Sequence, residues 1–205
     1  MVKSIRVMKL SGIAIALFLF LTVSVPVMSY EEPQYEIIKK TEIYEVRQYD
    51  QRTVARVTYG EEDSGFRILF DYISGENQGS TDVKMTVPVT QSTDINMTAP
   101  VTQSNAGDKM VMQFFLPRQY TKATAPKPTN PRVKIIDLPQ SYFAVIAYSG
   151  FASDGNFEKH HQTLKAALDA DGISISGPPM KASYNSPFTL PFLRRNEAMY
   201  PLAWN

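Results

Sequence analysis

The sequence YFAVIAYS at Tyr142–Ser149, followed by DGNFEKHHQTLKAALDA at Asp154–Ala170, contains the pattern on which the fold prediction depends. The first stretch is rich in aromatic and β-branched residues, which is typical of a strand. In the second stretch, one face carries residues at helical spacing, namely Phe157, His161, Leu164 and Leu168. We therefore predict a strand followed closely by a helix.

The chain before this pair repeats the same order of elements. Strand patterns at Ile43–Tyr49 and Thr53–Tyr59 precede a helical pattern over Gly65–Ser74, and Gly75 supplies a stop. The other predicted strands are Lys84–Val89, Asn96–Val101, Met110–Leu116, Val133–Leu138, Lys181–Tyr184 and Glu197–Leu202. Two successive strand-strand-helix-strand-strand units predict a pseudo-twofold α+β domain. Its antiparallel sheets would curve around a core, with one helix of each half packed outside.

A local repeat falls within the first half. Residues 82–92 read DVKMTVPVTQS and residues 94–104 read DINMTAPVTQS, so eight of eleven positions are identical. Proline cannot donate to a strand ladder, so each Met-Thr-x-Pro-Val unit should turn at its proline. We expect Met85 and Met97 to point inward, where a flexible thioether suits an apolar ligand wall. A strand-turn device with no ligand role explains the repeat equally well.

The N-terminal segment has the composition of a secretory signal. Residues 1–29 contain Lys3, Arg6 and Lys9, an apolar run over Ile13–Val23, and the sequence Val-Met-Ser at 27–29. We expect cleavage after Ser29, leaving residues 30–205 as one exported domain, periplasmic or secreted. The alternative is an uncleaved membrane anchor, the one case in which we expect contact with a membrane.

Charge and cysteine content narrow the classes of function. Three of the 21 basic residues lie in the N-terminal segment, so the rest of the chain, with 20 acids, carries a formal charge of −2. We therefore expect no nucleic-acid partner, because such a surface needs a clustered basic field. The chain contains no cysteine, which excludes disulfides, thiolate metal sites and a cysteine nucleophile. No nucleophile elbow, Walker loop, dinucleotide fingerprint or zinc-protease motif occurs, so we predict a non-enzymatic protein.

The resemblance to a known family is carried by motifs in order along the chain. They include Tyr44-Glu45-Val46-Arg47, Gly65-Phe66-Arg67, the doubled Met-Thr-x-Pro-Val, Phe114-Phe115-Leu116-Pro117, Pro187-Phe188-Thr189-Leu190-Pro191 and Arg194-Arg195-Asn196-Glu197. Over residues 31–204 the set resembles the SOUL heme-binding family. The resemblance implies a distorted antiparallel β-barrel of two ββαββ-like halves with two flanking helices. It also implies that heme or another porphyrin binds in an apolar groove. This chain differs from family members that have only one copy of the Met-Thr-x-Pro-Val unit.

Within that resemblance, the candidate heme-binding residues follow from periodicity and residue type. The groove wall would include Phe66, Phe70, Met85 and Met97, and Arg67 would pair with a propionate. Arg194 to Glu197 are either a groove rim or a structural ion-pair clamp, and we favour the clamp.

The two histidines are the remaining candidates. His160 and His161 are adjacent on a helix and point about 100° apart, so they cannot hold one ion together. One of them, His161 in the first place, could be an axial iron ligand. We favour the alternative that His161 is a hydrogen-bonded, semi-buried residue and His160 is exposed.

The functional prediction is non-covalent heme or tetrapyrrole binding by an exported carrier or buffer, mainly through an apolar groove. Covalent attachment is excluded because it needs cysteines. Two alternatives are a ligand-sensing or partner-binding module of the same fold that does not use heme, and an enzyme that acts on a tetrapyrrole.

Overall fold

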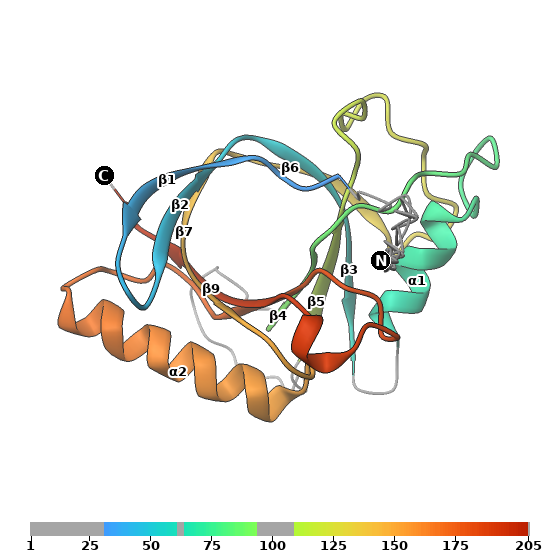
Figure 1. Ribbon diagram of the computed structural model, residues 1–205. Coiled ribbons are helices and arrows are strands. Elements are labelled where there is room, and N and C mark those ends of the chain that lie inside the picture. Colours follow the sequence, from blue (N-terminus) through green and yellow to red (C-terminus); the bar gives the residue numbers. More distant parts are fainter. Residues whose placement is uncertain (1–30, 61–63, 94–108, 205) are drawn as a thin grey trace, which may run out of the picture.

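The computed structural model describes residues 31–60, 64–93 and 109–204, and these form one curled sheet with helices outside it (Figure 1). The strands are β1 (Tyr35–Lys40), β2 (Glu45–Tyr49), β3 (Arg52–Tyr59), β4 (Val89–Thr93), β5 (Met110–Phe115), β6 (Lys134–Leu138), β7 (Ser141–Tyr148), β8 (Met180–Ser183) and β9 (Asn196–Leu202). The helices are α1 (Gly65–Ile73), α2 (Asp154–Ala170) and the short 3-10 helix η1 (Pro191–Leu193).

The strand order reveals a pseudo-twofold relation between the halves. All the strands belong to one antiparallel sheet, in the order β1-β2-β7-β9-β8-β4-β5-β3-β6. Outward from the central β8–β4 pair, β9 corresponds to β5, β7 to β3, and β2 to β6. The first strand of each ββαββ unit, β2 in one half and β6 in the other, therefore pairs with a strand of the opposite half. Strand β2 pairs with β7, and β6 pairs with β3. The predicted α+β fold class, a distorted antiparallel barrel with two flanking helices, is confirmed.

Both long helices begin and end where local chemistry requires. The Ser64 hydroxyl accepts a hydrogen bond from the backbone N–H three residues on, at 3.2 Å, and Ser153 does the same for α2 at 3.4 Å. Gly75 after α1 has φ of +107° and Gly172 after α2 has φ of +68°, the left-handed region that favours glycine. The predicted limits are therefore correct to within one residue. In the part of the chain that the structure describes, no helix is long and apolar enough to cross a bilayer.

Each helix packs on the outer face of its own half of the barrel. Under α1, Leu69 and Tyr72 contact residues of β3 and β5, including Phe114. Under α2, Leu164 and Leu168 are fully buried against β7 and β9. Each buried leucine contributes about 1.5–3 kcal/mol to folding. The helices are thereby fixed on the sheet, and the space between them lies over the central strands.

A buried ion-pair cluster fills part of the barrel interior. Glu197 is fully buried, and its Oε1 accepts hydrogen bonds from Arg47 Nη1 and Arg195 Nη2, each at 3.0 Å. The Tyr184 hydroxyl donates to the other carboxylate oxygen at 2.6 Å, and burial, followed by the charge of Glu197, raises the pKa of that hydroxyl. Arg195 also pairs with Glu32 at 3.0 Å. We call these five residues the Glu197 clamp; it confirms the structural role favoured for Arg195 and Glu197.

One strand prediction around the first Met-Thr-x-Pro-Val unit was wrong. The sequence pattern predicted a strand over Lys84–Val89, whereas β4 begins at Val89 and continues to Thr93. The physical reason is Pro88, which has no N–H to donate to the ladder, so pairing starts only after it. The second copy of the unit, with the predicted strand Asn96–Val101, lies outside the described residues, as does the predicted signal over residues 1–29.

Strand β1 was not among the predicted strands. It lies at one edge of the sheet, and nearly all its side chains are exposed. The adjacent residues Ile37 and Ile38 break the alternation, and the register with β2 shifts between Ile37 and Lys39. Its residues therefore do not alternate between a buried and an exposed face.

Candidate functional site

A groove of about 720 Å³ lies between the first turn of α1 and the segment that leads into α2. It covers the β4–β8 pair, the centre of the pseudo-twofold, so both halves of the chain line it. Its apolar lining consists of Phe66, Met85, Val87, Val89, Met112, Phe151, Ala152 and Pro187. A predominantly apolar groove of this volume can enclose a drug-sized ligand.

The floor and the α1 wall of the groove are set by strand alternation and ring packing. Val89 of β4 and Met112 of β5 are on the helix-facing side of the sheet and pack against the core under α1. Phe66 packs edge-on against Phe114, with ring centroids 5.3 Å apart, and stacks with Phe70 at 5.9 Å. The groove thus has a rigid base, while the ring of Phe66 is still partly exposed to solvent.

Two cations line the wall opposite α1. Arg194 donates from Nε to the carbonyl of Thr189 at 2.7 Å, and its guanidinium lies 5.3 Å from the ring centroid of Phe151. Among the described residues Arg194 makes no ion pair, so no carboxylate compensates its charge. Lys181 pairs with Asp154 at 2.8 Å, but that carboxylate is almost fully exposed and can turn to solvent. The wall can therefore receive carboxylates of a bound molecule.

A second cleft, of about 820 Å³, lies on the other side of Met85. Phe70 of α1 and Tyr120 line it, but so do Glu31 and Asp82. These two acids outnumber the one cation of the lining, Lys84, so the cleft suits an anionic ligand less well. The groove at Phe66 is the better candidate because it is more apolar and its wall is cationic.

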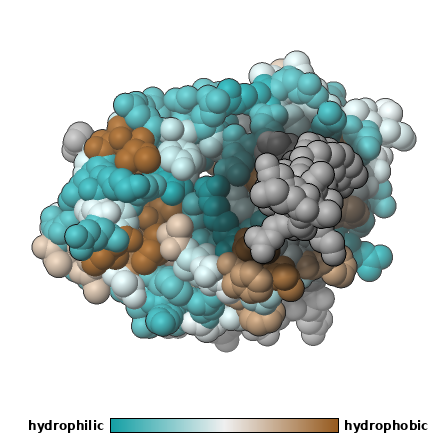
Figure 2. Space-filling model, in the orientation of Figure 1, coloured by the Kyte–Doolittle hydropathy of each residue, from teal (hydrophilic) through white to brown (hydrophobic). Residues whose placement is uncertain are grey.

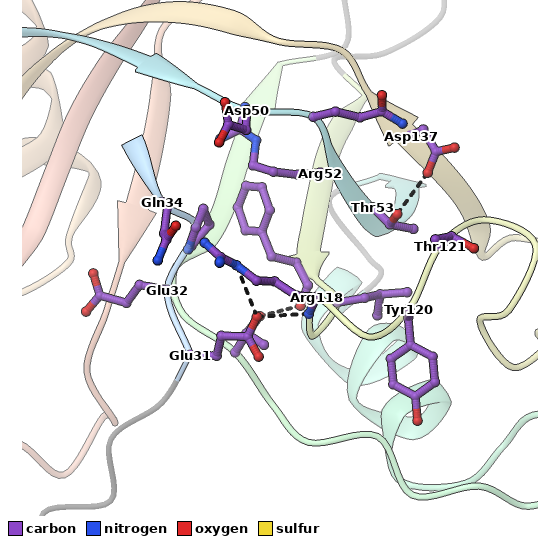
Figure 3. A pocket seen from close by; sticks show the side chains of 15 residues that line it. Glu31, Glu32, Gln34, Asp50, Arg52, Thr53, Arg118, Tyr120, Thr121 and Asp137 are labelled. Carbon is purple, nitrogen blue, oxygen red and sulfur yellow. Dashed lines mark hydrogen bonds and ion pairs between the residues drawn. The ribbon is translucent and has the colours of Figure 1, made fainter. Parts of the chain in front are cut away.

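A third cavity, of about 310 Å³, opens at one end of the barrel beside Arg52 (Figure 3). Arg52 donates to the Ser141 hydroxyl at 3.1 Å, its guanidinium lies 4.4 Å from the Tyr49 ring centroid, and burial lowers its pKa to about 10. Figure 3 also shows Glu31 facing Arg118, with which it pairs at 3.9 Å. This cavity is small and polar, so it fits a large apolar ring less well.

The structure brings some of the predicted binding residues together and separates others. Phe66 and Met85 line the groove, whereas Phe70 lines the second cleft, which also includes Met85. Arg67 is exposed on α1 and is not part of the groove lining. Met97 lies outside the described residues.

Both histidines lie on α2 outside the lining of the groove. The His160 ring stacks on Tyr148 with centroids 4.1 Å apart, and its Nδ1 is 2.7 Å from the carbonyl oxygen of Asn156. His161 Nδ1 is 2.9 Å from the Tyr200 hydroxyl, and its Nε2 is 2.8 Å from a Glu158 carboxylate oxygen. An axial role for His161 would therefore require it to give up one of two hydrogen bonds. Among the described residues, no three His, Asp or Glu side chains are placed to hold a metal ion.

Sequence reasoning missed several groove residues. Met112, Phe151 and Lys181 line the groove but were not among the predicted binding residues. Phe151 carried a signal that could have been used, because it is a lone aromatic between Gly150 and the helix cap Ser153. Arg194 had been considered as a groove rim, and it does line the groove.

Sequence comparisons place residues 30–201 within a family model described as SOUL heme-binding protein. Human heme-binding protein 2 is 27% identical over 143 residues, which cover 69% of this chain. The match spans 66% of the human protein, slightly less than two thirds of its length.

Solved structures share the fold at much lower identity. The C-terminal domain of EcmrR has a TM-score of 0.57 and 9% identity, covering 83% of this chain and 99% of that one. An uncharacterized conserved protein from Listeria innocua has a TM-score of 0.58 and 11% identity, covering 78% and 92%. A chain described as a hydrolase from Listeria innocua has a TM-score of 0.53 and 10% identity, covering 81% and 94%. Similarity at this level shows the fold alone.

Proposed function

Because this chain belongs to the SOUL heme-binding protein family, we propose that it binds heme or another tetrapyrrole non-covalently in the groove at Phe66. The observation that carries the proposal is the groove itself, with apolar side chains on its floor and Arg194 and Lys181 on one wall. The floor would contact the flat face of the macrocycle, and the two cations would pair with its propionates. Heme, when bound, would supply the iron chemistry.

Packing is sufficient for a useful affinity without an iron ligand. Burial of about 400 Å² of macrocycle at about 25 cal/mol/Å² contributes on the order of 10 kcal/mol before the cost of association. A micromolar complex needs about 8 kcal/mol. Since neither histidine lines the groove, we propose a carrier or buffer that holds the ring by shape and charge and catalyses no reaction.

We also propose that the protein is exported. The support is the signal-like composition of residues 1–29. Fractionation of the native host should recover the chain outside the cytoplasmic membrane. N-terminal sequencing should show whether it begins at residue 30.

Titration of the purified protein with hemin tests the proposed function directly. We expect a saturable, red-shifted absorption band, and comparable binding of iron-free porphyrin because packing dominates. If hemin only partitions non-specifically, as it does with a control protein of similar size, the proposal fails. Thermal stabilisation by other small molecules but not by porphyrins would favour a ligand-sensing module of the same fold.

Replacement of both histidines separates packing from iron coordination. We expect His160→Ala combined with His161→Ala to weaken hemin binding less than about tenfold, because both rings lie outside the groove lining. Hemin titration of the double variant measures this. A loss greater than about a hundredfold would identify one of them as an axial ligand.

A further inference from the structure

A run of large apolar side chains projects into solvent beside the groove. Phe188 is 96% exposed, Phe192 71% and Leu193 62%, and Leu190 is also more than half exposed. Figure 2 shows hydrophobic surface gathered over η1, which belongs to this run. We call residues 188–193 the apolar loop. Exposed apolar surface of this concentration marks an interaction site.

Part of the backbone of the apolar loop is hydrogen-bonded within the protein itself. The Leu190 and Pro191 carbonyls accept from the N–H groups of Leu193 and Arg194, at 2.9 and 3.1 Å. Gly150 N–H also donates to Pro191 at 2.9 Å, and the Arg194 side chain donates to the carbonyls on either side of Phe188. Hydrocarbon admits only backbone whose polar groups are paired within the protein. A protein partner, in contrast to hydrocarbon, can itself supply hydrogen bonds to backbone groups that the loop leaves unpaired.

The charge of the apolar loop also suits a phospholipid surface. The segment from Ser186 to Arg195 contains two arginines and no acid. Arg195 belongs to the Glu197 clamp, so Arg194 is the cation that this segment offers to a headgroup. Arg194 lies over the ring of Phe151 beneath the loop, where its guanidinium can meet a phosphate while its stem stays among apolar groups. No carboxylate of this segment would oppose the headgroups.

The apolar loop forms the lip of the groove. Pro187 and Arg194, the residues that flank the loop, and Phe151 all line the groove. Glu32, at the start of the described chain, pairs with Arg195 just beyond the loop. The described chain therefore begins at this end of the molecule, and an uncleaved N-terminal anchor would hold this end beside a membrane.

We propose that the apolar loop inserts into a phospholipid bilayer, with the mouth of the groove turned toward the lipid. This inference rests on the proposed function, since an apolar tetrapyrrole could then pass between bilayer and groove without crossing water. Insertion is driven by Phe188, Phe192 and Leu193 and is therefore only weakly dependent on salt.

Site-specific labelling tests insertion in the full chain, because a label in the apolar loop reports on the loop itself and not on residues 1–29. The chain has no cysteine, so Phe188→Cys gives a unique site for an environment-sensitive fluorophore. With phosphatidylcholine vesicles we expect a blue shift, and quenching by a nitroxide on the lipid acyl chain. The same label at Lys122→Cys, an exposed residue of the connector between β5 and β6, should show neither effect. Phosphatidylglycerol should add little, and high salt should not reverse insertion.

A second variant and a ligand titration distinguish the possible failures. Phe192→Ser with Leu193→Ser, in the chain labelled at position 188, should lower vesicle partitioning on the order of a hundredfold. A label that stays in water with both lipids would overturn the proposal. A blue shift that appears when the protein concentration is raised without vesicles would also overturn it, because the loop would then contact a second copy of the chain. Hemin titration without vesicles reports separately on the groove. Failure of bilayer insertion and failure of hemin binding can therefore be distinguished.

Discussion

Glu197→Ala is expected to lower the free energy of unfolding by about 3–5 kcal/mol, the largest effect of a single substitution that we foresee. The substitution leaves Arg47 buried and Arg195 half-buried without their shared carboxylate, and removes the acceptor of the Tyr184 hydroxyl. Arg47 keeps Glu45 and Arg195 keeps Glu32, but both of those carboxylates are more exposed than Glu197. The cost therefore comes mainly from the buried Arg47 charge, which loses its buried partner. Urea unfolding followed by circular dichroism measures it.

Two further variants make this result interpretable. Glu197→Gln retains the shape and one acceptor oxygen, so it should be less destabilising than the alanine variant. Asp169→Ala removes an exposed pair with Lys165 and should change stability by about 0.5 kcal/mol or less. If Glu197→Ala lowered the free energy of unfolding no more than Asp169→Ala does, the Glu197 clamp would not stabilise the fold.

The second large effect concerns the groove. Phe66→Ala combined with Phe151→Ala should weaken hemin binding on the order of a hundredfold, about 3 kcal/mol, because both aromatic walls are lost. Both side chains are partly exposed, so the fold should tolerate their truncation. Hemin titration gives the affinity, and thermal unfolding checks that the variant is folded.

Phe70→Ala is the matched control for this experiment. Phe66 and Phe70 lie on the same helix and are 43% and 44% exposed, but Phe66 lines the groove and Phe70 the second cleft. We expect hemin affinity to be nearly unchanged in Phe70→Ala. The opposite ranking, with Phe70 decisive and Phe66 neutral, would move the binding site to the second cleft.

The fold was largely predictable because its signals are local. The helix Asp154–Ala170 was predicted with its observed limits, since a one-sided apolar face marks its length. Strand β1 was missed because it has no buried face. The limits predicted for β4 were wrong because strand pairing begins only after Pro88. These errors occur where neighbouring strands, rather than the segment itself, decide the structure.

The groove was predictable only in part because distant segments build it. Phe66 and Met85 were found because a helical stripe and a repeated motif called attention to them. Met112 could not be assigned to the groove from sequence, since which face of β5 meets α1 depends on the sheet's assembly. Arg67 and Arg194 show the same limit: the sequence offered both arginines as candidates, but only Arg194 lines the groove in the fold.

The exchange of first strands between halves has a consequence for biogenesis. Strand β2 pairs with β1 on one side, but its other neighbour is β7, so that pairing waits until the second half of the chain has been made. Pairings of such long sequence separation form late, and the amino-terminal half would have an unfilled place beside β3 until β6 arrives. The amino-terminal half alone can pair β3, β4 and β5, but its sheet is completed only when the last strands of the chain have been made.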